Sequence, residues 1–201
     1  MSQNQEERYI RQLDSLLKEV ETPSQNISDF ELANNYLSIA NLSFVIGDKE
    51  QSSEYLDKSI EKGELINEDS LLLDYYYTLS HSLISYLAEY DKASVFIDKS
   101  ITLGKKLNDS LMVAKQYLLL GYNEGITGKQ GAGLSGFEKG LLYATRPSVI
   151  RANLLSRLCE QNFELNDFEK ARYYLNEAEK ISEFLEKHQL QSLRLSDYES
   201  R

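Results

Sequence analysis

The chain has 201 residues, of which 22 are basic and 32 acidic, giving a formal net charge of −10. This acidic excess repels polyanionic partners such as nucleic acid and anionic membrane, and no apolar run approaches the roughly 18 residues that cross a bilayer. The single cysteine, Cys159, excludes an internal disulfide and, with no apparent signal peptide, favours a cytoplasmic setting.

An amphipathic helix and a linker are predicted over residues 1–27, with apolar side chains at helical spacing. Pro23 falls after that helix, as expected where a helix has already ended. Ser28 and Glu31 form the capping box of a second helix, and Gly47 ends it. The apolar stripe of the first helix is Tyr9, Leu13, Leu16, Leu17 and Val20.

One sequence pattern of small and large residues then occurs four times. In each copy a small residue is followed four positions later by a large apolar residue, and three positions after that by another small residue. Successive copies lie 41, 40 and 38 residues apart. A period in this range is typical of a solenoid of helical hairpins. The four sets are Ser52/Leu56/Ser59, Ala93/Ile97/Ser100, Gly133/Phe137/Gly140 and Ala171/Leu175/Ala178.

Four helical hairpins and no strand are therefore predicted over residues 28–187. Asp48, Asp91 and Asp167 are the expected N-caps of the second helix in three of these hairpins. Residues 188–201 carry a new apolar stripe and are predicted to start a further helix, which is either a capping helix or a truncated fifth repeat. A truncated repeat would make the chain a fragment of a longer protein.

The spacing of small and large residues resembles that of the tetratricopeptide repeat. In that family small residues occupy the eighth, twentieth and twenty-seventh positions, with a large residue at the twenty-fourth, so that two helices approach closely. The resemblance implies an all-α, right-handed superhelical solenoid of antiparallel helix pairs. His81 is larger than the family's usual eighth residue, and the period is longer, as in arrays of bacterial regulators such as peptide-sensing receptors. The eighth-position equivalents are Ala40, His81, Gly121 and Cys159.

The resemblance also implies a ligand groove lined by the first helix of each hairpin. Its amides, hydroxyls and aromatics suit an extended peptide. Tyr75, Tyr86 and Tyr122 are the expected anchors, unless they pack between helices. Leu37 stands where family members that bind chaperone C-termini have a lysine, so such a ligand is excluded. The predicted groove residues are Asn34, Leu37, Asn41, Phe44, Thr78, Ser82, Tyr86, Lys115, Leu118, Tyr122, Asn153 and Glu160.

No constellation of residues points to catalysis, a metal ion or a cofactor. Gly128–Gly136 resembles a phosphate loop only superficially, because Lys129 is not followed by Ser or Thr. His81 and His188 lie in distant hairpins, so the pattern does not combine them into one site. We expect His81 to be a packed helix residue and Cys159 to be a buried, unreactive thiol.

The sequence therefore predicts a non-enzymatic, cytoplasmic module that binds a protein or peptide, with no cofactor, nucleic acid or direct membrane contact. We expect it to be the sensory or regulatory part of a larger bacterial signalling protein. The alternative is a structural adaptor or homo-oligomerisation scaffold that acts through its exposed end helices.

Overall fold

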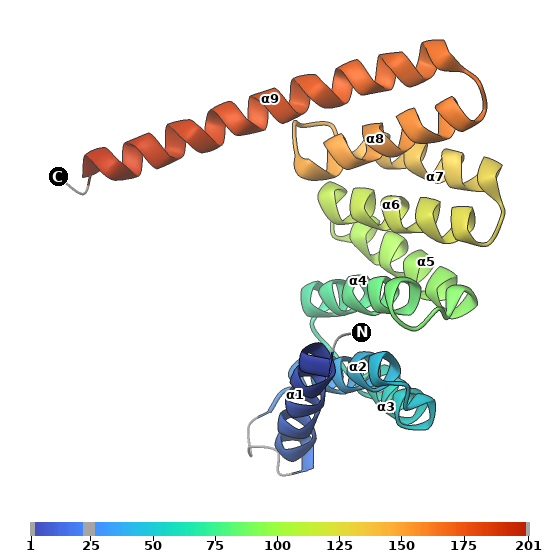
Figure 1. Ribbon diagram of the computed structural model, residues 1–201, viewed down its shortest axis with the longest axis vertical. Helices are drawn as coiled ribbons and strands as arrows, with labels where there is room; N and C mark the ends of the chain where they lie inside the picture. Colours follow the sequence, from blue (N-terminus) through green and yellow to red (C-terminus); the bar gives the residue numbers. More distant parts are fainter. Residues whose placement is uncertain (1–2, 22–26, 200–201) are drawn as a thin grey trace. The chain divides into compact units, whose positions relative to one another are not determined.

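The computed structural model describes residues 3–21 and 27–199, and within these ranges it contains nine α-helices and no strand (Figure 1). The predicted all-α fold is thus confirmed for the described part of the chain. The helices are α1 (Gln3–Glu21), α2 (Asp29–Ile46), α3 (Lys49–Gly63), α4 (Asp69–Ser85), α5 (Tyr90–Lys106), α6 (Ser110–Ile126), α7 (Gln130–Tyr143), α8 (Val149–Glu164) and α9 (Phe168–Glu199).

Two compact units make up the chain, Met1–Leu103 and Gly104–Arg201. In the first unit α2 packs against α1, α3 and α4, and a ring contact of 5.8 Å between Tyr76 and Phe96 joins α4 to α5. In the second unit α6 packs against α7, α7 against α8, and α8 against α9. Neighbouring helices therefore pair as hairpins, as the repeated sequence pattern predicts.

Small residues bring the two helices of the first hairpin together. The hydroxyl of Ser52 donates to the Ala40 carbonyl at 2.9 Å, and that of Ser59 donates to the Ala33 carbonyl at 2.8 Å. Leu56 lies between the two serines and is 3% exposed. The alternation of small and large residues therefore produces the close helix contact that it predicts.

Glycines give the α6–α7 hairpin an even closer contact. A Cβ atom built on Gly133 would lie 2.9 Å from the carbonyl oxygen of Gly121, and one on Gly136 would lie 3.0 Å from the Gly121 nitrogen. Phe137 is 3% exposed and packs in a core with Leu154 of α8. These glycines are explained by packing, and Gly128, with φ +82°, forms the turn between the helices.

The fourth copy of the sequence pattern differs from the others in the exposure of its large residue. Ala171 and Ala178 are buried against α8, but Leu175 is 47% exposed. Phe137, the equivalent residue one hairpin earlier, is covered by α8. Since α9 is the last described helix, no later described hairpin covers Leu175 in the same way.

The α4–α5 turn corrects two predictions. In the turn after α2, the Asp48 amide donates to the carbonyl five residues earlier, whereas in the turn after α4 the Glu89 amide donates to the carbonyl six residues earlier. The extra residue is accommodated at Ala88, whose φ of +54° is left-handed. The extra residue shifts the register of α4 relative to α5 by one position. As a result, Ser80 is buried at 0% exposure, while His81 is exposed. The predicted packing of His81 is wrong for this reason.

The start of α5 also differs from the prediction. The Ala93 amide donates to the Glu89 carbonyl, as the Ser52 amide donates to the Asp48 carbonyl one hairpin earlier. Glu89 therefore holds the N-cap position, and Asp91 lies inside the first turn of α5 instead of capping it.

The C-terminal helix is longer than predicted. We expected a further helix from residue 188, but α9 continues without a break from Phe168 to Glu199. This stretch contains neither Gly nor Pro, so no residue in it stops the helix.

Candidate functional site

The predicted groove residues of α2 make contacts within the protein. The Asn34 side chain donates to the Phe30 carbonyl at 2.8 Å on its own helix, and the Asn41 amide donates to the Ser82 hydroxyl at 3.0 Å. Leu37 and Ser82 are 1% and 3% exposed. Both residues are buried between helices, and their prediction as groove residues is corrected to packing.

Asn41 joins α2 to α4 through its amide nitrogen. Its Oδ1 atom is buried and accepts no hydrogen bond from any residue that the structure describes. A buried acceptor of this kind costs roughly 1–3 kcal/mol when it loses water. Asn41 therefore acts first as a link between two hairpins.

An aromatic row occupies the exposed side of α4 and its C-terminal end. The ring centroids of Tyr77 and His81 are 6.5 Å apart, and those of His81 and Tyr86 are 6.3 Å apart. Tyr86 is 46% exposed. Thr78 is also exposed, but its hydroxyl donates to the Asp74 carbonyl. We call Tyr77, His81 and Tyr86 the aromatic row.

Tyr75 is buried and belongs to the core. It is 1% exposed, and its hydroxyl donates to the Ser59 carbonyl at 2.7 Å. Burial raises the pKa of Tyr75 well above its ordinary value. Of the two roles considered for this tyrosine, packing between helices is correct.

In the second unit, two of the predicted groove residues, Tyr122 and Glu160, contact Arg157. The Arg157 guanidinium lies 5.2 Å from the centroid of the Tyr122 ring and forms an ion pair with Glu160. Tyr122 also packs edge-on against Phe137 at 5.7 Å. Leu118, at 8% exposure, belongs to the core and is corrected to a packing residue. The remaining predicted residues are Lys115, partly buried, and Asn153, exposed.

Sequence reasoning predicted Tyr86 as a groove residue but missed Arg157 and the other two members of the aromatic row. Arg157 precedes Glu160 by three residues, and this helical pairing is visible in the sequence. Tyr77 and His81 were missed because the extra residue of the α4–α5 turn shifts the register of α4 relative to the fixed repeat spacing.

A pocket of about 160 Å³ adjoins Phe44 in the first unit. It lies between the end of α2, the first half of α3 and the α4–α5 turn. The long turn contributes Leu87, which is 6% exposed and covers one side of the pocket. The lining residues are Phe44, Lys49, Ser52, Ser53, Leu56, Leu87 and Glu89.

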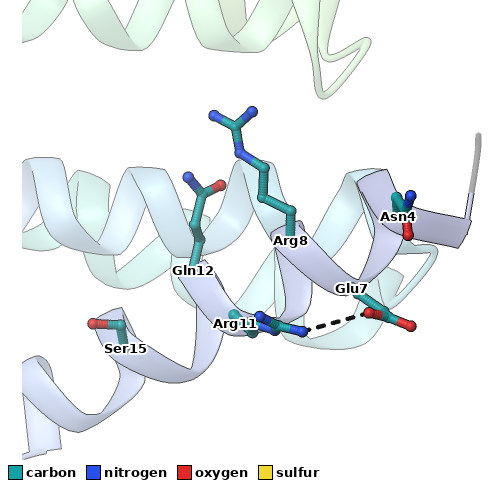
Figure 2. A pocket seen from close by; sticks show the side chains of 6 residues that line it. All are labelled: Asn4, Glu7, Arg8, Arg11, Gln12 and Ser15. Atoms are coloured by element: carbon teal, nitrogen blue, oxygen red, sulfur yellow. Dashed lines mark hydrogen bonds and ion pairs between the residues drawn. The ribbon is translucent and has the colours of Figure 1, made fainter.

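A second depression, of about 470 Å³, lies along α1 (Figure 2). Its only ion pair among the drawn residues joins Arg11 to Glu7 at 3.5 Å, and the Arg11 side chain is 80% exposed. All six lining residues come from this one helix, so the depression is an open surface without a second wall from another lining element. They are Asn4, Glu7, Arg8, Arg11, Gln12 and Ser15.

Three further features bear on the class of site. Within the described residues, no group of three or more His, Cys, Asp or Glu side chains is placed to hold a metal ion. Cys159 is partly buried, against the expectation of a fully buried thiol. Among the described helices, none combines the length and apolar composition needed to cross a membrane.

Comparison with solved structures agrees with the fold. The chain is similar to BtubC (BKLC) from P. vanneervenii, with a TM-score of 0.69 and 13% sequence identity over 91% of this chain and 76% of that one. It is also similar to a Rap protein complexed with competence and sporulation factor, with a TM-score of 0.46 and 19% identity over 90% of this chain and 49% of that one. No family model matches the chain, and no curated protein matches it significantly. The chain therefore has a helical repeat fold, and its tetratricopeptide character remains a resemblance.

Proposed function

We propose that this protein is a binding module for a protein or peptide partner, and that the partner contacts the aromatic row of α4. The observation that carries the proposal is the exposure of Tyr86 and His81 next to Tyr77 on one helix. Exposed aromatic side chains that lie together supply much of the binding energy of protein interfaces. The net charge of −10 favours a partner segment that is neutral or basic.

The proposal includes a biological setting. The helical repeat fold provides surfaces and needs no catalytic group or cofactor, so the proposed role is non-enzymatic. A sensory or regulatory role in the cytoplasm, within a larger bacterial signalling protein, is the setting that the tetratricopeptide resemblance supports.

The experiment compares two sets of substitutions in the full chain. The double variant His81→Ala/Tyr86→Ala removes two members of the row, and Tyr173→Ala is the matched control because Tyr173 is 59% exposed in the other unit. Affinity capture from the source cells, with quantitative mass spectrometry, should identify a partner that only the double variant loses. Its affinity should fall at least tenfold, as for an aromatic contact of about 2 kcal/mol. Equal capture by all forms, with unchanged helicity, would exclude the aromatic row as the binding surface.

A second function, as an oligomerisation scaffold, is favoured by an apolar cluster at the α8–α9 turn. Phe163, Leu165 and Phe168 are 63%, 55% and 55% exposed, and the two phenylalanine rings are 5.4 Å apart. Exposed apolar clusters of this kind often mark interfaces. Sedimentation equilibrium should then show self-association that Phe163→Ser/Phe168→Ser removes, and a monomer at all concentrations would exclude this function.

A further inference from the structure

The pocket beside Phe44 has an apolar wall and a charged rim. Phe44, Leu56 and Leu87 provide the apolar wall, from α2, α3 and the α4–α5 turn. Leu56 and Leu87 are 3% and 6% exposed, so their side chains are held by the fold. The volume of about 160 Å³ is below the range of about 300–1,000 Å³ of drug-sized sites, so it suits a ligand smaller than a drug molecule.

The rim carries two opposite charges that do not neutralise each other. Lys49 and Glu89 both line the pocket, yet no ion pair within 4.0 Å joins them. Glu89 has a distant partner in Lys92, at 3.8 Å, and Lys49 has no ion-pair partner among the described residues. The pocket is therefore lined by a cation and an anion that do not pair with each other.

A ligand that matches this arrangement carries an ammonium and a carboxylate on one small scaffold, with an apolar group beside them. The carboxylate would approach Lys49, where the Ser53 hydroxyl also lines the pocket, and the ammonium would approach Glu89. Charged hydrogen bonds of this kind are the stronger ones.

We propose that this pocket binds a single α-amino acid with an apolar side chain, in its zwitterionic form. The side chain contacts Phe44, Leu56 and Leu87, while Lys49 and Glu89 hold the two charged ends. The site is separate from the aromatic row, so it does not depend on the proposed partner binding.

The test uses three probes that share the leucine side chain and differ in the charge of the amino and carboxyl groups. L-leucine carries both charges, N-acetyl-L-leucine only the carboxylate, and L-leucinamide only the ammonium. Each is titrated into the full chain while the backbone amide signals of residues 44–56 and 87–89 are followed by NMR. L-leucine should shift these signals saturably, and each blocked probe should bind at least tenfold more weakly.

Substitutions then assign the charges. Lys49→Gln should weaken L-leucine binding at least tenfold, and Lys49→Glu/Glu89→Lys should restore part of the loss by exchanging the two ends. Lys58→Gln is the matched control, because Lys58 lies on the same helix, is paired with Glu54 at 2.6 Å and does not line the pocket. No saturable shift with up to 10 mM L-leucine, L-methionine or L-phenylalanine would overturn the proposal. Equal binding of the blocked probes, or no effect of Lys49→Gln, would also overturn it. The capture experiment on the aromatic row is unaffected by either result.

Discussion

Gly133 and Gly125 are predicted to respond in opposite ways to substitution by alanine. Both lie in the α6–α7 hairpin of the second unit, so the same unfolding transition reports on both. A Cβ at Gly133 would lie 2.9 Å from the Gly121 carbonyl oxygen and 3.3 Å from the Gly125 nitrogen. These are backbone atoms, and they can move only if α6 and α7 separate. A Cβ at Gly125 meets no atom within 4 Å.

The expected change in the free energy of unfolding is the balance of two opposing contributions. Alanine gains about 0.5–1 kcal/mol over glycine in a helix, mainly because the unfolded chain has less freedom to lose. Forcing an extra carbon into a packed contact costs about 1–3 kcal/mol. Gly133→Ala should therefore be destabilising by about 1–2 kcal/mol, whereas Gly125→Ala should be stabilising by about 0.5 kcal/mol, less than the full gain because Gly125 is close to the end of α6.

Urea unfolding followed by circular dichroism measures both changes. The midpoint should fall for Gly133→Ala and rise slightly for Gly125→Ala, with unchanged slopes. If Gly133→Ala is as stable as the natural protein, the close contact between the two backbones does not exist in solution. A loss of stability in Gly125→Ala as large as in Gly133→Ala would show that the glycines serve flexibility and not packing.

Two other predictions concern buried polar groups of the first unit. Tyr75→Phe should be destabilising by about 0.5–1.5 kcal/mol at pH 7, because the hydroxyl bond to the Ser59 carbonyl is lost. Burial raises the folded-state pKa of Tyr75, so the contribution of its neutral form is complete below about pH 10 and is lost as the pH rises towards that pKa. The stability difference between the two proteins in urea should thus shrink at alkaline pH, and a constant difference would contradict this reasoning. Ser82→Ala should be more destabilising than Asn41→Ala, at about 1–3 kcal/mol, since it removes the bond of the Asn41 amide nitrogen while the buried Oδ1 atom of Asn41 stays without a donor. The reverse order, measured in the same urea experiment, would show that the Asn41–Ser82 bond contributes little.

The sequence was sufficient for the hairpin packing, because residue size at fixed spacing determines how closely two helices can approach. Ser52, Gly133 and Ala171 all lie at the predicted contacts. The pattern failed at His81 because the α4–α5 turn contains one extra residue, so counting back from Ala93 by the spacing of the other hairpins reaches the wrong residue of α4, which is about 100° away around a helix of 3.6 residues per turn. Ala93 follows Glu89 by the same four positions as Ser52 follows Asp48, so the sequence itself favoured Glu89 over Asp91 as the N-cap of α5.

The candidate site was less predictable than the fold. Position in a repeat indicates which side of a helix a residue occupies, but not which neighbour its polar atoms meet. Asn41 was predicted to line the ligand groove, yet its amide nitrogen donates to the Ser82 hydroxyl within the protein. The Phe44 pocket depends on Leu87, which belongs to the irregular turn, so no repeat spacing could have indicated it.

The close contact between hairpin helices is made by different chemistry in the two units, and this has a mechanical consequence. In α2–α3, Ser52 and Ser59 each bond to a carbonyl of the facing helix, so axial sliding by one residue would break both bonds. In α6–α7 the facing surfaces of Gly121, Gly133 and Gly136 have no side chain to form such bonds. The first hairpin should therefore resist shear along its axis, whereas the second should resist compression but yield more readily to sliding.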